Sequence, residues 1–170
     1  MSQGEPDVWH PMKAGDLQSV SLLSDKIYPP EYREQASVFE EKLSLFPAGC
    51  FCAVVERRLV GYCLAYPWKD RNVPPLNQPL ETIPAHASTY FIHDLALSSD
   101  TREKGLGAAA VTLQFAVARA QSIDRTSLVA VLHSQRFWRR SGFEVVHDEM
   151  VQESVRKRYG PDAHYMERIL

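Results

Sequence analysis

The stretch Tyr90–Gly107, YFIHDLALSSDTREKGLG, constrains this chain more than any other part of it. It begins as an apolar segment that predicts a β-strand, then passes through a polar turn into Arg-x-x-Gly-x-Gly and an Ala-rich helix. A glycine-rich turn at a helix start presents unpaired backbone N–H groups and the positive end of the helix dipole. Gly105 and Gly107 lack a Cβ, so the backbone can lie close to a diphosphate and adopt a positive φ. With Arg102 and Lys104 beside it, this turn indicates a phosphate site.

A dinucleotide site is the main alternative for the same glycines. The run from Gly105 to Ala110 fits G-x-G-x-x-G/A, with Asp124 about 20 residues further on. In a dinucleotide-binding unit, however, the strand runs directly into the first glycine, and the acidic residue ends the next strand. Here the charged turn 98–104 intervenes, and Asp124 precedes the strand expected at 127–132. The sequence also lacks the Walker pattern G-x-x-x-x-G-K-[ST], so an oxidoreductase is the least favoured function.

His93 lies on the strand just before this turn and can exchange protons near neutral pH. A base beside a phosphorylated cofactor favours group transfer. The period of two in a strand places His93 with Phe91 and Leu95 on one face and Asp94 on the other, unless a bulge intervenes. The alternative is a structural histidine satisfied by a backbone carbonyl. Asp94 either binds a substrate ammonium around such a bulge or caps a neighbouring loop.

The composition fits a single soluble domain spanning residues 1–170. Apolar residues make up 45% of the chain and charged residues 24%, which is usual for a globular protein. The formal net charge of −2 argues against a nucleic-acid partner, because such partners usually need a basic face. No apolar run has the length of a membrane span and the first residues lack a signal-peptide pattern, so we expect a cytoplasmic protein without a membrane partner. Three cysteines favour buried thiols over a disulfide framework, and no metal site is expected.

The hydrophobic patterns predict strands and helices around this central strand. Asp16 is the expected N-cap of the first helix, and Tyr28-Pro29-Pro30 ends it because proline cannot continue a helix. The segment 67–88 holds five of the eleven prolines and is expected to be a long loop, a kind that is usually functional or disordered. These elements predict an α/β sandwich with a mixed sheet and flanking helices. Strands are expected at 8–12, 50–56, 59–66, 90–97, 127–132, 143–150 and 163–170, helices at 16–25, 31–46, 102–121 and 134–141, and a helical turn at 152–158.

Two motifs together resemble the GCN5-related N-acetyltransferases, the GNAT superfamily. The first is Arg-x-x-Gly-x-Gly after the Leu-Ala-Leu strand end, and the second is Phe-Trp-Arg-Arg-Ser-Gly-Phe at 137–143, one strand later. The resemblance covers roughly residues 8–170 and is nearest to the arylalkylamine (serotonin-type) enzymes. Those enzymes pair a His-containing strand with a segment similar to FPAGCFCAVVERRLVGYCLAYPW at 46–68. Diamine acetyltransferases are a second comparison, since they carry Glu-Asp where this chain has His93-Asp94.

This resemblance implies an α/β GNAT fold, with a mixed, mostly antiparallel sheet of about six or seven strands and about four flanking helices. Two of the strands are expected to splay apart at the cofactor site. The resemblance also implies acetyl-CoA as the cofactor, and direct transfer of its acetyl group to a primary amine of an arylalkylamine- or polyamine-like small molecule in a ternary complex. His93 would be the base and Asp94 a second catalytic residue, and a homodimer is a candidate assembly because family members are often dimers. The implied cofactor residues are Leu95, Ala96, Leu97, Arg102, Glu103, Lys104, Gly105, Leu106, Gly107, Ala108, Ser134, Phe137 and Trp138, and the implied acceptor residues are Tyr28, Pro29, Glu31, Tyr66 and Trp68.

Trp138 departs from the family pattern, which usually has a tyrosine there as the general acid for the leaving thiolate. An indole N–H donates a hydrogen bond but cannot deliver a proton. Either another group serves (Tyr159, Tyr165 or a water), or the thiolate leaves unprotonated, or catalysis is weak. Ser134 either donates to the pantetheine arm or is a plain N-cap. Phe137 and Trp138 alternatively form a wall for the cofactor and the core.

Two further functions are consistent with the same sequence. A protein or peptide N-acetyltransferase would need an open peptide groove, whereas a non-catalytic acyl-CoA-binding sensor would fit the missing tyrosine. The resemblance also implies that the segments 27–34 and 67–88 border the acceptor. Their aromatic rings and scattered carboxylates suit an amine cation, and the alternative is that the aromatic side chains only anchor these loops to the core. The alternative for Glu31, Glu34, Asp70 and Glu81 is that they are solvated surface charges.

Overall fold

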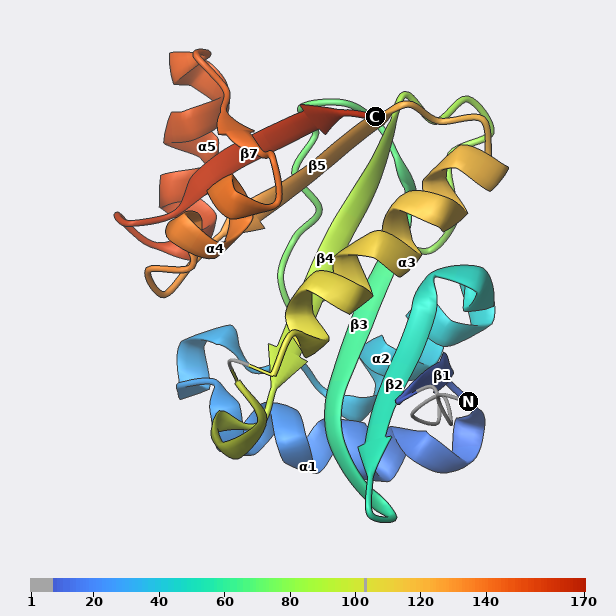
Figure 1. The fold of residues 1–170 in the computed structure, drawn as a ribbon. Coiled ribbons are helices and arrows are strands. Elements are labelled where there is room, and N and C mark those ends of the chain that lie inside the picture. Colours follow the sequence, from blue (N-terminus) through green and yellow to red (C-terminus); the bar gives the residue numbers. More distant parts are fainter. Residues whose placement is uncertain (1–7, 103) are drawn as a thin grey trace, which may run out of the picture.

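The computed structural model describes residues 8–102 and 104–170, which contain seven strands and five α-helices (Figure 1). Short 3-10 turns lie between several of these elements. The strands are β1 (Trp9–Pro11), β2 (Cys50–Val55), β3 (Arg58–Trp68), β4 (Thr89–Leu97), β5 (Arg125–Ala130), β6 (Glu144–Val145) and β7 (His164–Ile169). The helices are α1 (Leu17–Ile27), α2 (Ala36–Leu45), α3 (Leu106–Ala120), α4 (Gln135–Arg140) and α5 (Glu149–Tyr159).

All seven strands form one sheet in the order β1-β2-β3-β4-β5-β7-β6. Neighbouring strands are antiparallel except β4 and β5, which are parallel. This arrangement confirms the mixed, mostly antiparallel α/β fold expected from the sequence. None of the helices within the described ranges is long and apolar enough to span a bilayer.

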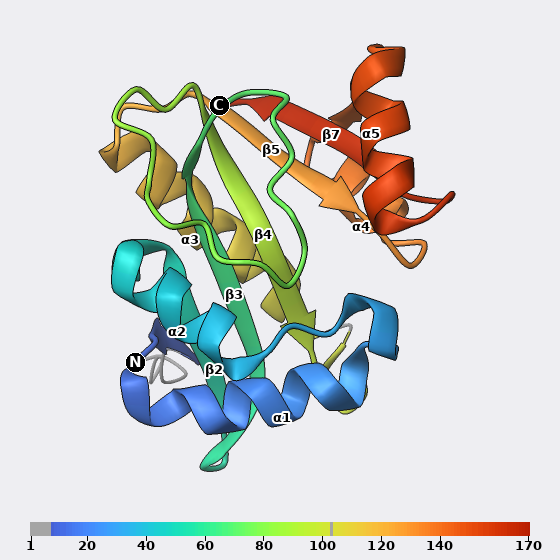
Figure 2. The same cartoon turned by 180° about the vertical axis from the view of Figure 1, so that it is seen from behind.

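Helices cover both faces of the sheet. α3 lies across the face seen in Figure 1, and α1 and α2 lie across the opposite face, seen in Figure 2. Trp138 of α4 packs in the same core cluster as Phe115 of α3, whereas Val155 of α5 shares a cluster with Tyr66 and Phe91. Thus α4 belongs to the face of α3, and α5 belongs to the face of α1 and α2.

The second and third helices begin later than expected. Pro30–Tyr32 forms a separate 3-10 turn, and α2 starts only at Ala36 rather than at residue 31. The Gln35 N–H, just before α2, donates a hydrogen bond to Asn77 Oδ1 (2.8 Å). Asn77 is distant in the sequence, so the local hydrophobic pattern could not predict this contact. α3 starts at Leu106 rather than at residue 102, because the preceding glycine adopts a left-handed conformation.

The chain after α4 also differs from the prediction. The strand expected at 143–150 is only Glu144–Val145, and α5 has eleven residues where a helical turn was expected. The reason is a helix cap: the Asp148 carboxylate accepts a hydrogen bond from the Val151 N–H and starts α5 inside the expected strand.

β2 and β3 form the hairpin expected from the sequence. Glu56 and Arg57 make the turn with φ values of 48° and 66°, the left-handed conformation that matches the twist of a two-residue hairpin. β3 continues to Trp68, so the long loop comprises residues 69–88.

β4 and β5 pair over only three residues and then diverge. Tyr90–Ile92 pairs with Thr126–Leu128, and in Figure 1 the two strands open as a wedge beyond this point. From His93 to Leu97, the edge of β4 that faces β5 has no strand partner among the described residues. Backbone N–H and C=O groups on that edge are available to a ligand. The expected splay of two strands is therefore present.

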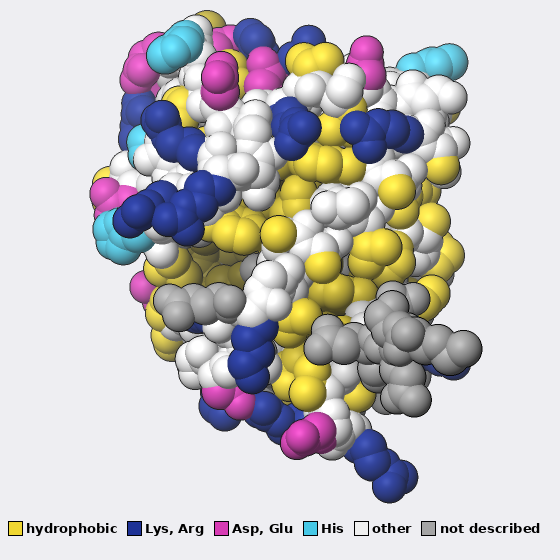
Figure 3. Space-filling view, viewed as in Figure 1, with side chains coloured by type: hydrophobic (Ala, Val, Ile, Leu, Met, Phe, Trp, Pro, Cys, Tyr) yellow, Lys and Arg dark blue, Asp and Glu magenta, His cyan; other side chains and the backbone are white. Residues whose placement is uncertain are grey.

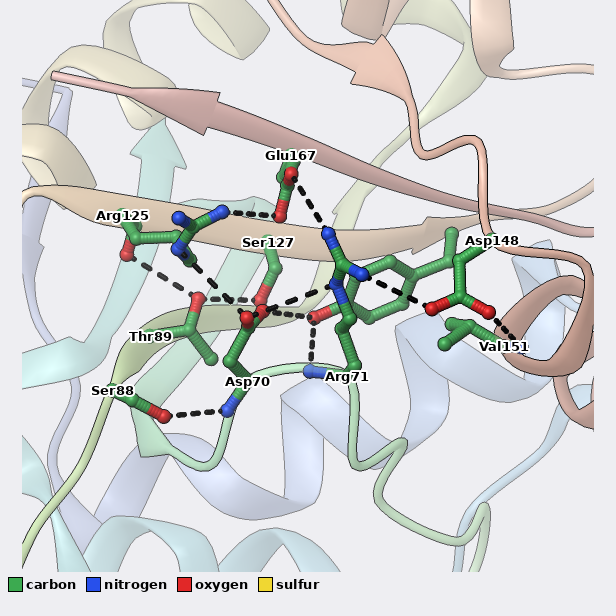
Figure 4. Close-up of polar contacts among 10 residues, drawn as sticks. Asp70, Arg71, Ser88, Thr89, Arg125, Ser127, Asp148, Val151 and Glu167 are labelled. Atoms are coloured by element: carbon green, nitrogen blue, oxygen red, sulfur yellow. Dashed lines mark hydrogen bonds and ion pairs between the residues drawn. The ribbon is translucent and has the colours of Figure 1, made fainter.

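An ionic network fastens the beginning of loop 69–88 to the C-terminal strands (Figure 4). The Arg71 guanidinium donates to Asp148 (3.0 Å), and its backbone N–H donates to Tyr165 Oη (3.0 Å). Glu167 lies 3.9 Å from the same guanidinium and accepts a hydrogen bond from Arg125 (2.8 Å).

The rest of the loop is bonded on both sides. On one side, Arg158 and Tyr159 of α5 donate to the carbonyl groups of residues 73–74 (2.7 and 2.6 Å). On the other side, the Glu41 carboxylate of α2 accepts from the N–H groups of residues 80–81 (2.6 and 3.0 Å). Loop 69–88 therefore ties α2 to α5 across the face shown in Figure 2.

Candidate functional site

A β-bulge in β4 determines where its two polar side chains lie. Consecutive residues of β3 pair with Asp94 and Ile92, so His93 is an extra residue in β4. His93 contacts Tyr66 and Asp94 contacts Tyr62, and these two tyrosines share one face of β3. The simple alternation expected from the sequence is therefore wrong at this point, and His93 and Asp94 share the face that α1 and α2 cover.

His93 is held by side chains at both ring nitrogens. Nε2 lies 2.6 Å from Glu34 Oε1, and Nδ1 lies 3.0 Å from Tyr66 Oη. The ring also packs against Tyr66 and Phe91, and the side chain is 1% exposed. The structure thus places His93 in a polar network of side chains rather than against a backbone carbonyl.

Glu34 is the central residue of this network, and the sequence left open whether it faces an amine cation or is a solvated surface charge. The surface alternative is wrong, since its side chain is 3% exposed. Oε2 accepts a hydrogen bond from the Asn77 N–H (2.9 Å) and lies 3.8 Å from Lys42 Nζ. Burial alone would raise the pKa of Glu34, but His93 and Lys42 lower it to about 2. Glu34 is therefore ionised at neutral pH.

Lys42 of α2 is a second buried charge that the sequence analysis missed. Its side chain is 1% exposed, and within the described ranges Nζ has no hydrogen-bond partner. Burial lowers the pKa of Lys42, and the nearby Glu34, Glu41 and Asp94 oppose that shift. Because an uncompensated buried charge is costly, Lys42 and Glu34 depend on each other for their ionised forms.

Asp94 accepts hydrogen bonds from two phenol hydroxyls, those of Tyr28 after α1 (2.6 Å) and Tyr62 of β3 (2.7 Å). Burial raises the pKa of Asp94 to about 6, although both hydroxyls and His93 act in the opposite direction. Tyr28, expected at the acceptor site, therefore lies beside Asp94 with its hydroxyl committed to that carboxylate.

Asp94→Asn is expected to remove a pH dependence of stability between about pH 4 and about pH 6. The folded-state pKa of about 6 lies above the ordinary value of 3.8, so the folded protein binds the proton more readily in this interval. The free energy of unfolding should fall by about 3 kcal/mol as the pH rises through it, and the asparagine variant should lack this decline. Urea unfolding of both proteins at a series of pH values measures the difference. A parallel decline in the two proteins would contradict this assignment.

The glycine turn lies at the open end of the wedge. Gly105 has φ of 76° and open space around a Cβ position, so the backbone conformation favours glycine there. Gly107 is in the first turn of α3, where a Cβ would lie 2.9 Å from Phe137 Cε2. The second glycine is thus explained by the close approach of an aromatic ring from α4, in addition to the expected phosphate.

The other residues of the turn differ in their exposure to solvent. Arg102, Lys104 and Ala108 are exposed, and Glu103 lies outside the described residues. The carbonyl of the half-buried Leu106 accepts a hydrogen bond from the Trp9 indole (3.0 Å), which ties the start of α3 to β1. Figure 3 shows a hydrophobic hollow between α4 and the start of α3, with Lys and Arg side chains gathered beside it. The exposed arginines of α4 are Arg136, Arg139 and Arg140.

The two aromatic side chains of α4 differ in burial and in contacts. The ring of the half-buried Phe137 packs against Gly107 and, edge-on, against Trp138 at 4.9 Å. Trp138 is 7% exposed and packs against Phe143 at 5.5 Å. Ser134 is half-buried at the N-cap of α4 without a side-chain cap bond. Trp138 is therefore a core residue, whereas Phe137 lies against the glycine turn.

The residues expected to hold the pantetheine arm lie on the unpaired part of β4. Leu95 and Leu97 pack toward the α3 face, and Ala96 packs toward the α1 face. Their side chains are thus used for packing, and what they offer a ligand is backbone. In the part of the chain that the structure describes, no group of three or more His, Cys, Asp or Glu side chains is arranged to hold a metal ion, and all three cysteines are buried and free.

The expected acceptor residues are spread over the opposite face. Tyr66 is buried and Trp68 is half-buried, with the two rings edge-on at 5.6 Å. The Trp68 indole donates to the carbonyl of Asn72 in loop 69–88 (2.7 Å). Pro29 is half-buried and Glu31 is exposed. The structure thus brings Tyr28 and Tyr66 to the polar network but leaves Glu31 outside it.

A tyrosine bridge closes the same face. The Tyr32 hydroxyl, from the segment between α1 and α2, donates to the carbonyl of Tyr159 at the end of α5 (2.6 Å). Tyr159 and Tyr165, the alternatives considered for a general acid, have hydroxyls bonded to Pro74 and Arg71 of loop 69–88. The segment 28–35, loop 69–88 and α5 therefore form one connected cover.

Comparisons with known proteins agree with this geometry. The model of the acetyltransferase (GNAT) family matches residues 17–143. Curated proteins gave no match. Among solved structures, Rv2747 from Mycobacterium tuberculosis in complex with CoA is 16% identical, with a TM-score of 0.70 over 96% of this chain and 99% of that chain. Arabidopsis thaliana Naa50, in complex with the bisubstrate analogue CoA-Ac-MVNAL, is 12% identical, with a TM-score of 0.65 over 95% of this chain and 97% of that chain.

A third similar structure, the GNAT-like decarboxylase GphF in complex with isobutyryl-CoA, is 12% identical, with a TM-score of 0.74 over 95% of this chain and 98% of that chain. At such identities the likeness shows the fold alone, since one fold hosts several chemistries. The family model, by contrast, spans most of the chain and includes β4, the glycine turn and α4. The chain therefore belongs to the acetyltransferase (GNAT) family of enzymes.

Proposed function

We propose that this protein transfers the acetyl group of acetyl-CoA to the primary amine of a small molecule by direct attack in a ternary complex. The proposal rests on the position of β4 at the point where it diverges from β5. There β4 lies between two surfaces of different chemical character. The α3 side offers free backbone and a glycine turn, which suit a diphosphate-linked thioester. The opposite side offers aromatic rings and buried carboxylates, which suit an amine.

Acetyl-CoA fits the α3 side in two segments. The unpaired edge of β4 at Leu95–Leu97 is free to hydrogen-bond the pantetheine arm as a neighbouring strand would. The start of α3 after Gly105 presents N–H groups and the positive end of its dipole to the diphosphate, with Arg102 and Lys104 nearby. In our proposal the hollow between α4 and the start of α3 receives the rest of the cofactor. The similar structures named above contain CoA, isobutyryl-CoA or the bisubstrate analogue CoA-Ac-MVNAL.

The chemistry of acetyl transfer requires three things of these residues. The ammonium must lose a proton before its nitrogen can attack, and we assign this step to His93. The oxyanion that forms on the thioester carbonyl needs preorganised donors, for which the free N–H groups of β4 are suited. The thiolate leaves with the electrons of the C–S bond and takes up the second proton of the attacking nitrogen, which completes the amide. Trp138 is buried and does not titrate, so we propose that the thiolate leaves without a proton from that position.

A small acceptor is favoured over a peptide by the tyrosine bridge. The Tyr32–Tyr159 hydrogen bond and the Glu34–Asn77 hydrogen bond join the segments that cover His93. An extended polypeptide needs an open groove there, whereas a small amine does not. Within small amines, the rings of Tyr66 and Trp68 favour an arylalkylamine or a polyamine cation.

Release of free CoA from acetyl-CoA, measured over a panel of acceptors, tests this function. The panel contains arylalkylamines, polyamines, aminoglycosides and short peptides with free N-termini, each scanned from about pH 6 to about pH 9. We expect turnover with one class of small amine and none with the peptides. Turnover restricted to peptides would replace the small-molecule proposal by a peptide N-acetyltransferase. Stabilisation by acetyl-CoA without any turnover would favour a binding protein.

A further inference from the structure

The contact between His93 Nε2 and Glu34 Oε1 indicates which nitrogen of His93 carries the proton and which one accepts the proton of the amine. We propose that Glu34 is a positioning residue that holds the proton of neutral His93 on Nε2, and so leaves Nδ1, beside the Tyr66 hydroxyl, as the nitrogen that takes up the proton of the amine. The inference rests on the proposed function for the identity of the proton donor. Its first part, the position of the proton on His93, is a property of the protein alone.

Glu34 can only accept hydrogen bonds, and this fixes the donor in its contact with His93. Both carboxylate oxygens are engaged: Oε2 accepts from the Asn77 N–H (2.9 Å) and lies 3.8 Å from Lys42 Nζ, and Oε1 lies 2.6 Å from His93 Nε2. Lys42 is itself buried, and its charge favours the carboxylate. An ionised carboxylate carries no proton, so the hydrogen in the contact at 2.6 Å belongs to Nε2.

The second ring nitrogen then follows from the chemistry of imidazole. A neutral ring with a proton on Nε2 has a lone pair on Nδ1. Tyr66 Oη lies 3.0 Å from Nδ1 and, as a phenol, donates its proton into that lone pair. Tyr66 adjusts to this arrangement because its hydroxyl can donate or accept, whereas Glu34 cannot. Of the two partners, Glu34 therefore sets the tautomer.

The proton step balances within these groups. When the amine gives up its proton, the N–H electron pair stays on the amine nitrogen for attack on the thioester. The proton forms a new bond to Nδ1, the ring becomes an imidazolium with N–H on both sides, and the Tyr66 hydroxyl rotates to accept. The new positive charge lies against the Glu34 carboxylate, which stabilises the imidazolium.

Other ionisable groups surround this pair on several elements. They decide the net charge around the ring, so any pH dependence belongs to the whole set. Its members are Tyr28 after α1, Glu41 and Lys42 of α2, Tyr66 of β3, Asp94 of β4 and Tyr159 of α5.

The tautomer is read from the imidazole ¹⁵N chemical shifts of ¹⁵N-histidine-labelled protein, at a pH where the ring is neutral and without cofactor or amine. His93 is assigned by loss of its signals in His93→Gln. In the wild-type protein we expect a protonated Nε2 and an unprotonated Nδ1. In Glu34→Gln, where the amide can donate or accept, we expect a mixture of both tautomers. Tyr66→Phe should keep the wild-type tautomer because Glu34 remains.

Glu41→Gln is the matched control. Like Glu34→Gln, this variant removes a carboxylate that accepts hydrogen bonds from backbone N–H groups of loop 69–88. Glu41, however, does not touch His93. We expect Glu41→Gln to leave the His93 spectrum unchanged.

Kinetics on the amine found active then tests the catalytic part. Glu34→Gln should lower kcat by about 10²–10⁴-fold, the range reached when a base loses its orienting carboxylate. Its affinity for acetyl-CoA should stay at the wild-type value, and the acid limb of its pH–rate profile should move to lower pH, because the imidazolium has lost its counter-charge. Glu41→Gln should move that limb much less than Glu34→Gln does, because Glu41 does not touch the ring.

The outcomes separate this inference from the proposed function. A wild-type ring protonated on Nδ1, or a Glu34→Gln spectrum identical to the wild type, overturns the positioning role whatever the enzyme acetylates. A mixed tautomer in Glu34→Gln with unchanged kcat and pH profile overturns the catalytic part. If the wild-type enzyme turns over no acceptor in the panel, the small-amine function is refuted. The ¹⁵N spectrum still decides the tautomer of His93 in that case. If Glu34→Gln fails to fold, the wild-type and Tyr66→Phe spectra decide between the two tautomers.

Discussion

Gly107→Val is expected to weaken the binding of acetyl-CoA severely. A Cβ at this position would lie 2.9 and 3.0 Å from two atoms of the Phe137 ring and 3.5 Å from Leu97 Cδ1, and valine adds two methyl groups beyond it. Phe137 packs edge-on against the buried Trp138, so it cannot retreat into the core. Overpacking of this kind costs about 1–3 kcal/mol and forces the ring or the first turn of α3 to move. Either movement disturbs the surface on which we place the cofactor.

Isothermal titration with acetyl-CoA measures this effect, and we expect affinity to fall by about a hundredfold or more, equivalent to about 2.7 kcal/mol. Ala116→Val is the control, because Ala116 is an exposed position of the same helix, remote from the glycine turn. It introduces the same β-branched side chain into the same helix without touching Phe137. Wild-type affinity in Gly107→Val would remove the glycine turn from the cofactor site.

His93→Gln is expected to lower kcat by about 10²–10⁴-fold with acetyl-CoA affinity unchanged. That factor is typical for loss of a general base. Glutamine is a better test than alanine here, since its amide can still donate to the buried Glu34 carboxylate. Leaving that carboxylate without a donor would destabilise the fold and confuse the result. The amide does not titrate, so the variant should also lack the limb of activity near neutral pH.

Steady-state kinetics from about pH 6 to about pH 9, beside urea unfolding of the same protein, separates chemistry from folding. If His93→Gln keeps the wild-type stability but lacks the limb of its pH–rate profile near neutral pH, the result would support His93 as the general base. A pH–rate profile that matches the wild type would show that His93 is structural.

The strand, turn and helix that we propose for the donor could be predicted largely from the sequence because their signals are local. Gly105 marks a left-handed turn, the helix after it needs no tertiary information, and the apolar run of β4 is continuous. The family model reaches the same segments. What the local pattern could not supply is the contact of Gly107 with Phe137, since these residues meet only after α4 packs on α3.

The face that we propose for the acceptor was predicted poorly because its contacts join residues distant in sequence. Glu34 and Lys42 carry ordinary surface residue types on a loop and a helix, and only the packing of loop 69–88 buries them. The bulge at His93 has no residue signature, yet it moves Asp94 to the other face of the sheet. The position of Glu34 was a signal that could have been used. Glu34 lies between two prolines and a helix, in the segment that the family resemblance places over the acceptor.

Loop 69–88 has a consequence for how tightly a ligand can be held in the wedge. Only three residue pairs join β4 to β5, so these strands would otherwise form a hinge between the two parts of the sheet. The loop crosses behind this hinge, bonded to Glu34 and Glu41 on one side and to Tyr159 on the other. A hinge fastened at its back does not have to close around its ligand. Acetyl-CoA would then enter a slot that already has its bound shape, and little conformational entropy would be lost on binding.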